Sequence, residues 1–202
     1  MKALKFILIA CAIATGSASA QTYNFIFDKK AKTGISKQTD GNAIDILPAD
    51  VYQPDKSYGY DFTEATGKAE QGEPFFFSVD VPDGNYKVTV TLGSKKSKGC
   101  TTVRAESRRL FLENITTKRD EFKTLSFVVN KRNTKIGDND RVKIKKREEN
   151  KLNWDNKLTI EINGDAPACA AIRIEPAAEN APTIWLCGNS TVVDQDYEPW
   201  AS

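Results

Sequence analysis

The residues with the clearest chemical content lie in the segment 183–192, TIWLCGNSTV. A continuous apolar run leads into Gly188, Asn189 and Ser190, and Thr191 follows. A serine at the sharp turn that ends a buried strand projects its hydroxyl beyond the sheet, where it can act as a nucleophile. The Gly-Asn-Ser triplet by itself is also typical of ordinary turns, so its interpretation depends on the residues around it.

A serine nucleophile needs a neighbouring base to take its proton, and histidine usually has this role. The chain contains no histidine. Removal of the base from a serine hydrolase lowers turnover by a factor on the order of a million. We therefore expect no measurable esterase activity from this chain by itself. The absence of histidine, together with the spacing of the cysteines, also predicts no metal site, and we expect no cofactor.

Residues 1–20 predict a secretory signal peptide. Lys2 and Lys5 precede the apolar stretch FILIACAIATG, and small residues precede the expected cleavage site before Gln21. Lipoprotein cleavage at Cys11 is the less favoured alternative, because it would leave a very short apolar core. No later segment approaches the roughly 18 apolar residues of a transmembrane helix. We expect a secreted or periplasmic protein that makes no membrane contact after cleavage.

The charges balance once this leader is removed. The 29 Lys and Arg lose two, which leaves 27 against 27 Asp and Glu. This balance disfavours nucleic acid and anionic membranes as main partners. The local exception is residues 131–151, and its stretch RVKIKKR alternates basic and apolar side chains. The favoured interpretation is an edge strand protected by its charges, and the alternative is a patch for an acidic polysaccharide.

Alternating apolar residues predict short strands through residues 21–175. In FFFSVDVPDGNYKVTVTLG, two alternating runs flank the turn signal PDGN, which predicts a β-hairpin with one buried face. Short strands separated by Gly, Asn, Asp and Pro indicate an all-β fold, a β-sandwich or jelly roll. Further strands are expected at 108–115, 122–130, 141–147, 157–164 and 169–176.

Residues 176–182, PAAENAP, have the composition of a linker. After it, the run TIWLC is typical of a strand covered on both faces of a parallel sheet. Three cysteines follow the leader, namely Cys100, Cys169 and Cys187. An odd number leaves at least one unpaired. A disulfide between Cys100 and Cys169 and buried free thiols are both compatible with the sequence.

The stretch around Ser190 resembles the first conserved block of the SGNH (GDSL) hydrolases, specifically the rhamnogalacturonan acetylesterases. In that group a strand leads into Gly-Asp-Ser-Thr-Val, and a Pro-Trp-Ala-Ser run follows. The corresponding residues here are Gly188 to Val192 and Pro199 to Ser202. The stretches YNFIFD, GYDF, FFFSVDVPDGNYKVTVTLG and KLTIEINGDAPACAAIRIE also resemble the β-sandwich that precedes the hydrolase domain in some of these esterases.

This resemblance implies a galactose-binding-like sandwich, followed in residues 183–202 by the first strand of a truncated α/β hydrolase domain. Ser190 would occupy the nucleophile position, and its backbone N–H would be one oxyanion donor. Asn189 departs from the aspartate of the family, which puts hydrogen bonds that need a carboxylate in doubt. The chain would be the N-terminal part of a secreted carbohydrate esterase, acting on an acetylated plant cell-wall polysaccharide similar to rhamnogalacturonan.

An alternative interpretation is a stand-alone carbohydrate-binding β-sandwich. Such modules stack aromatic rings against sugars, and the candidates are Tyr58, Tyr60 and Trp154. Each of these is as plausible in the core or at its rim. A purely structural spacer is a third possibility, since a β-sandwich serves many functions.

Overall fold

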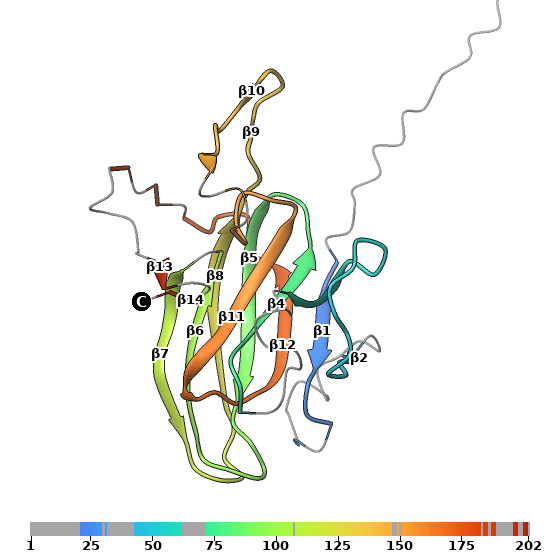
Figure 1. Ribbon diagram of the computed structural model, residues 1–202, viewed down its shortest axis with the longest axis vertical. Coiled ribbons are helices and arrows are strands. Elements are labelled where there is room, and N and C mark those ends of the chain that lie inside the picture. The colour runs from blue at the N-terminus through green and yellow to red at the C-terminus, as the bar shows by residue number, and fades with distance from the viewer. Residues whose placement is uncertain are drawn as a thin grey trace, which may run out of the picture.

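Two five-stranded sheets pack face to face as a β-sandwich (Figure 1). The predicted all-β sandwich is therefore confirmed. The computed structural model describes residues 21–29, 31, 43–61, 72–106, 108–146, 149, 151–182, 184–185, 187–188, 196–197 and 200–201.

The first sheet has the strand order β2-β1-β12-β5-β8, and the second has the order β3-β4-β11-β6-β7. Neighbouring strands run antiparallel, except that β1 and β2 are parallel. The first sheet consists of β1 (Tyr23–Ile26), β2 (Ala43–Asp45), β5 (Gly84–Leu92), β8 (Lys123–Lys131) and β12 (Cys169–Pro176). The second consists of β3 (Tyr58–Asp61), β4 (Phe75–Asp80), β6 (Gly99–Ala105), β7 (Arg109–Thr117) and β11 (Lys157–Ala166).

Two small hairpins lie outside these sheets. One pairs β9 (Lys135–Ile136) with β10 (Asp140–Arg141), and the other pairs β13 (Asp196–Tyr197) with β14 (Trp200–Ala201). In Figure 1 the β9–β10 hairpin projects beyond the end of the sandwich at which β8 ends.

The core lies between the sheets and follows from period-2 alternation, which turns every second side chain inward. Phe25 of the first sheet meets Phe77 of the second with ring centroids 4.8 Å apart, in an edge-to-face contact. At the other side of the sandwich, Phe111 of β7 stacks on Phe127 of β8 at 4.3 Å. Both contacts join one sheet to the other. The largest apolar side chains that are fully buried are Phe25, Phe77, Leu92, Leu158, Ile160, Ile162, Ile172 and Ile174.

The two strands that were expected to form a hairpin lie in opposite sheets. β4 pairs with β3 and β11, whereas β5 pairs with β12 and β8. The predicted hairpin is therefore wrong, although both strands form where they were expected. Residues 81–83 carry the chain across the sandwich instead of reversing it within one sheet. Alternation does not distinguish the two arrangements, because Phe77 and Val88 face the same core in either case.

The prediction of a strand over 141–147 is also wrong in extent. β10 ends at Arg141, and residues 142–145 are irregular. Strand β6 was not expected, because GCTTVRA has no clear alternation of large apolar residues. It nevertheless lies inside the second sheet, between β11 and β7. The remaining expected strands correspond to β7, β8, β11 and β12, each within two residues.

The three cysteines that follow the leader are free thiols in this structure. Cys100 is half-buried, Cys169 is buried and Cys187 is exposed. Burial raises the pKa of the Cys169 thiol to about 12, and a backbone hydrogen bond with Ala171 opposes this shift. Because the thiolate is the reactive form of cysteine, Cys169 is chemically inert at neutral pH.

Candidate functional site

Polar side chains gather at one end of the sandwich, where β4 and β8 end and where β5 and β11 begin. This end carries a pocket of about 350 Å³. Its volume lies near the lower limit of small-molecule sites, which span roughly 300–1,000 Å³. The lining residues are Asp80, Val81, Pro82, Asp83, Lys131, Asn133 and Asn156.

Lys131 is the buried cation of this pocket. It follows Phe127 and Val129 at the spacing of two that turns side chains inward, and its side chain is only 1% exposed. A buried ammonium must be paired, and Lys131 Nζ lies 3.0 Å from Asp83 Oδ1. The same oxygen accepts a hydrogen bond from the Asn133 backbone N–H at 3.0 Å. Asp83 therefore links the β4–β5 connection to the end of β8.

Glu106 is the buried acid beside Lys131. β6 ends at Ala105, and Glu106 turns the backbone with a φ of +49°. Its N–H donates to the Thr159 carbonyl at 3.0 Å, and its own Oε1 accepts the return hydrogen bond from the Thr159 N–H at 3.1 Å. The Glu106 carboxyl oxygen thus takes the place of the backbone acceptor that the turn removes from the β-ladder.

The main effect of the protein around Glu106 is to exclude water from its carboxyl group, which disfavours the ionised form. Burial raises its pKa to about 8, although the Thr159 N–H and the Arg109 and Lys131 charges favour the ionised form. Arg109 Nη2 lies 3.7 Å from Glu106 Oε2. Burial in turn lowers the pKa of Arg109, and the Glu106 charge opposes that change.

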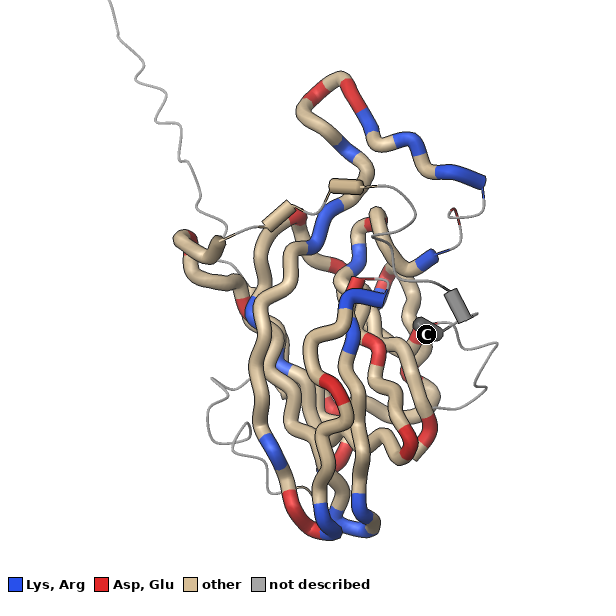
Figure 2. Tube along the Cα trace, turned by 90° about the vertical axis from the view of Figure 1, so that its left-hand side faces the viewer, with Lys and Arg blue, Asp and Glu red and all other residues tan. Residues whose placement is uncertain are grey.

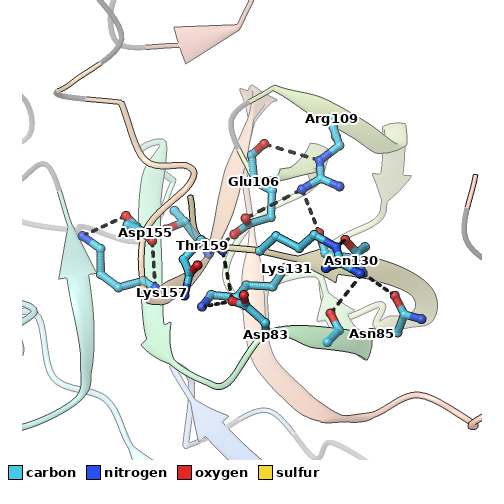
Figure 3. A network of polar contacts seen from close by, with 12 residues as sticks. Asp83, Asn85, Glu106, Arg109, Asn130, Lys131, Asp155, Lys157 and Thr159 are labelled. Atoms are coloured by element: carbon cyan, nitrogen blue, oxygen red, sulfur yellow. Dashed lines mark hydrogen bonds and ion pairs between the residues drawn. The ribbon is translucent and has the colours of Figure 1, made fainter. Parts of the chain in front are cut away.

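Figure 3 shows how this network continues toward the first sheet. Arg109 Nη2 donates to the Asn130 carbonyl at 2.9 Å, and Asn130 Nδ2 donates to Asn85 Oδ1 at 2.7 Å. The contacts therefore join the β6–β7 turn to β8 and β5. The β6–β7 turn belongs to the second sheet, whereas β8 and β5 belong to the first, so the network ties the two layers together at the end that carries the pocket.

A second group of contacts lies on the other side of the pocket. Tyr52 Oη donates to Asp80 Oδ1 at 2.7 Å, and Lys157 Nζ lies 2.6 Å from Asp61 Oδ2. The Lys157 ammonium also sits 4.6 Å from the Tyr52 ring centroid. Burial, followed by the hydrogen bond to Asp80, raises the pKa of Tyr52. The phenol is therefore a fixed donor that orients the Asp80 carboxylate.

Trp154 is the sugar-stacking candidate that the structure places beside the pocket. It is 39% exposed, and its backbone forms a bridge to Asn133, which lines the pocket. Its φ of +58° lies in the left-handed region. This conformation is uncommon for a large residue, so the loop holds the indole at some cost. The neighbouring Asn153 Oδ1 is buried and has no donor among the described groups.

The two tyrosine candidates lie elsewhere. Tyr60 is only 7% exposed and packs edge-to-face against Phe75 and Phe77 at 5.3 and 5.8 Å. It is a core residue, with no free face for a sugar. Tyr58 is half-buried against Phe25, with the Lys56 ammonium 5.1 Å from its ring centroid.

The predicted nucleophile Ser190 and its neighbours Asn189 and Thr191 lie outside the described residues, whereas Gly188 is described and exposed in irregular chain. Of the preceding apolar run, Ile184 and Trp185 are 84% and 64% exposed and belong to no strand. A strand needs a partner for its backbone groups, and no described strand lies beside these residues.

The segment expected to be a linker is attached to the sandwich. The Ala177 N–H donates to the Asn85 carbonyl at 2.9 Å, next to the last strand pair of β12. Further along, the Arg132 guanidinium lies 5.0 Å from the Trp185 ring centroid.

Sequence reasoning missed the pocket residues Asp83 and Lys131 and the acid Glu106. Asp83 was interpreted only as part of a turn signal. A signal for Lys131 was present, because it continues the inward series Leu125, Phe127 and Val129. No local pattern marks Glu106, whose partners are contributed by β11 and β7.

Two properties of the described residues bear on the class of site. They contain no cluster of three His, Cys, Asp or Glu side chains that could hold a metal ion. Within the same part of the chain, no helix is long and apolar enough to cross a membrane.

No protein-family model matches the chain, and no curated protein matches it either. Among solved structures, the crystal structure of the protein YxiM from Bacillus subtilis is similar to 79% of this chain, with 19% sequence identity and a TM-score of 0.43. The chain spans 41% of the length of that protein.

Proposed function

We propose that the β-sandwich is a carbohydrate-binding domain and that the pocket beside Lys131 receives one sugar unit of a polysaccharide. The observation that carries this proposal is the combination of a pocket lined mainly by polar residues with a partly exposed tryptophan, Trp154, whose backbone is bridged to the lining residue Asn133. Sugar hydroxyls both donate and accept hydrogen bonds. The pocket supplies acceptors in Asp80 and Asp83, and the side-chain amides of Asn133 and Asn156 can donate and accept.

Preorganisation supports the same function. Asp80 is held by Tyr52, and Asp83 is held by Lys131 and the Asn133 N–H. Groups that are fixed before a ligand arrives lose less entropy on binding. Trp154, whose backbone is bridged to Asn133, has the exposed aromatic side chain on which a pyranose ring can stack.

Affinity electrophoresis of the full chain in gels that contain neutral plant cell-wall oligosaccharides and polysaccharides tests this proposal. We expect retarded migration, with Trp154→Ala weakening binding by about 3- to 10-fold. Asn156→Ala should also weaken it. Trp185→Ala is the matched control, because Trp185 is an exposed tryptophan that does not line the pocket. Unchanged mobility on every polysaccharide, or equal effects of the two tryptophan variants, would count against sugar binding by this pocket.

A second proposal rests on the sequence motif around Ser190. We propose that residues 183–202 belong to an SGNH-type hydrolase domain and that the whole protein is an exported esterase resembling rhamnogalacturonan acetylesterases. The specific support is the pair of matches at Gly188 to Val192 and Pro199 to Ser202. Because the chain has no histidine, we expect no turnover of p-nitrophenyl acetate. Hydrolysis that disappears in Ser190→Ala would show that a base other than histidine activates this serine.

A further inference from the structure

The β9–β10 hairpin and the chain around it form an arm, defined here as residues 132–146. Asp140 pairs with Ile136 and Arg141 pairs with Lys135, and the ladder continues with the Val142 N–H donating to the Thr134 carbonyl at 2.7 Å. The arm projects from the sandwich at the end that carries the pocket (Figure 1). It belongs to neither sheet of the sandwich.

The arm is strongly cationic. Six of its side chains are basic and two are acidic, a net charge of +4, whereas the whole chain has a net charge of +2. Figure 2 shows the basic residues of the arm following one another along its returning limb. The acidic residues are Asp138 and Asp140, near the tip of the hairpin. The basic residues, all exposed, are Arg132, Lys135, Arg141, Lys143, Lys145 and Lys146.

Exposure alternates along the returning limb. Arg141, Lys143 and Lys145 are exposed, whereas Val142 and Ile144 between them are half-buried. The cations of this limb are therefore exposed to solvent, with half-buried apolar residues between them. A row of cations along an extended limb matches a linear partner with repeated negative charges.

Protection of a sheet edge does not account for these charges. Charged residues on an edge strand prevent it from pairing with another chain. At this side of the sandwich, β8 is the open edge of the first sheet and β7 is the open edge of the second. The cations of the arm lie in neither of these strands. The hairpin itself has only two pairs of bridged residues, which offer little edge to protect.

The base of the arm is continuous with the pocket. Lys131 and Asn133, which flank the first residue of the arm, both line the pocket, and Trp154 is bridged to Asn133. A polymer with one unit in the pocket would therefore lie close to the base of the arm. Two linked contacts of this kind strengthen binding more than either does alone.

We propose that the arm is a second, electrostatic binding surface for a linear acidic polysaccharide, which binds through its carboxylate groups. This inference rests on the proposed function, because the pocket and Trp154 are what favour a sugar polymer over other polyanions. The pocket contains two carboxylates and one ammonium, so it suits a neutral sugar unit. The arm supplies the attraction for the acidic units.

Affinity electrophoresis of the full chain with polygalacturonate tests the arm. We expect retardation that weakens steeply with added salt, because exposed charges are screened. The variant Arg141→Gln/Lys143→Gln/Lys146→Gln should bind at least about tenfold more weakly. The matched control is Lys95→Gln/Lys96→Gln/Lys98→Gln, which removes three exposed cations from the β5–β6 loop at the opposite end of the sandwich and should bind as the parent does. Thermal unfolding of both variants verifies that the sandwich is intact.

The fully methyl-esterified polymer and a DNA duplex complete the test. Methyl esterification removes the carboxylate charges, so it should abolish the contribution of the arm. The inference is overturned if polygalacturonate causes no retardation, if both triple variants lose binding equally, or if duplex DNA binds as tightly as the acidic sugar. Neutral oligosaccharides report separately on the pocket: binding to them that is lost in Trp154→Ala, without retardation by polygalacturonate, would refute only the arm. Arm-dependent retardation without any neutral-sugar binding would refute only the pocket.

Discussion

Glu106→Gln should remove much of the pH dependence of stability in this protein. The Glu106 carboxyl is buried beside Arg109 and Lys131, and burial raises its pKa to about 8 from an ordinary value of 4.5. The glutamine side chain keeps an oxygen that can accept the Thr159 N–H, but it has no proton to lose. The substitution therefore isolates the free energy of ionising one buried carboxyl.

The direction in which the free energy of unfolding changes with pH follows from which state, folded or unfolded, binds the Glu106 proton. Between pH 4.5 and 8 the folded protein keeps the Glu106 proton, whereas the unfolded chain releases it. The unfolded state then binds one proton fewer, so the free energy of unfolding falls by about 1.4 kcal/mol per pH unit through this window. Below pH 4.5 Glu106 contributes no pH dependence. Above pH 8 the full cost applies, on the order of 5 kcal/mol.

Urea unfolding of parent and variant at intervals from pH 4.5 to 9, followed by circular dichroism, measures this difference. The two proteins should be similar in stability near pH 4.5, and Glu106→Gln should become progressively more stable than the parent up to about pH 8. The control is Glu113→Gln, since Glu113 is an exposed carboxyl on the neighbouring strand β7. Parallel stability curves for parent and Glu106→Gln would refute the reasoning, because they would show that Glu106 titrates equally in both states.

Further predictions concern the buried ion pair and the backbone. Asp83→Ala leaves the Lys131 ammonium buried without its nearest partner and should cost about 3–5 kcal/mol, whereas Lys131→Met should cost clearly less, because the Asp83 side chain is 33% exposed and can be hydrated. Equal losses in urea unfolding would contradict this asymmetry. Gly59→Ala should destabilise the fold by more than about 3 kcal/mol, because Gly59 has a φ of +152° and a Cβ would overlap the backbone of Tyr52. Gly137→Ala, at a φ of +58° with open space around it, should cost only about 1–2 kcal/mol, and thermal unfolding of the pair would show whether the difference is real.

The fold class was predictable because alternation is a local property. Strands β7, β8, β11 and β12 each carry an apolar face that must be buried, and turn residues separate them. The pairing of β4 and β5 was not predictable in this way. Inward-facing side chains reach the same core whether two successive strands lie in one sheet or in opposite sheets, so alternation contains no information on that choice.

The candidate site, like the fold, was only partly predictable from the sequence. The sequence indicated Trp154 as one of three candidate stacking residues, with Tyr58 and Tyr60, and showed the positive charge of residues 131–151, because residue type and composition are visible without a fold. The pocket itself depends on tertiary structure, since Asp83, Lys131 and Asn156 come from three separate connections or strand ends. The pairing of Lys131 with Asp83 spans 48 residues, and that of Glu106 with Thr159 spans 53.

By itself, then, the sequence determined an all-β chain with a buried apolar face on each main strand and a concentration of positive charge in one segment. The tertiary structure decided that this charge stands on an arm outside both sheets, at the same end as the pocket. The physical reason is that hydrophobic alternation specifies which face of a strand is buried, whereas pocket and arm depend on which strand ends meet. Which strand ends come together depends on how the two sheets pack, and this packing involves residues that are far apart in the chain.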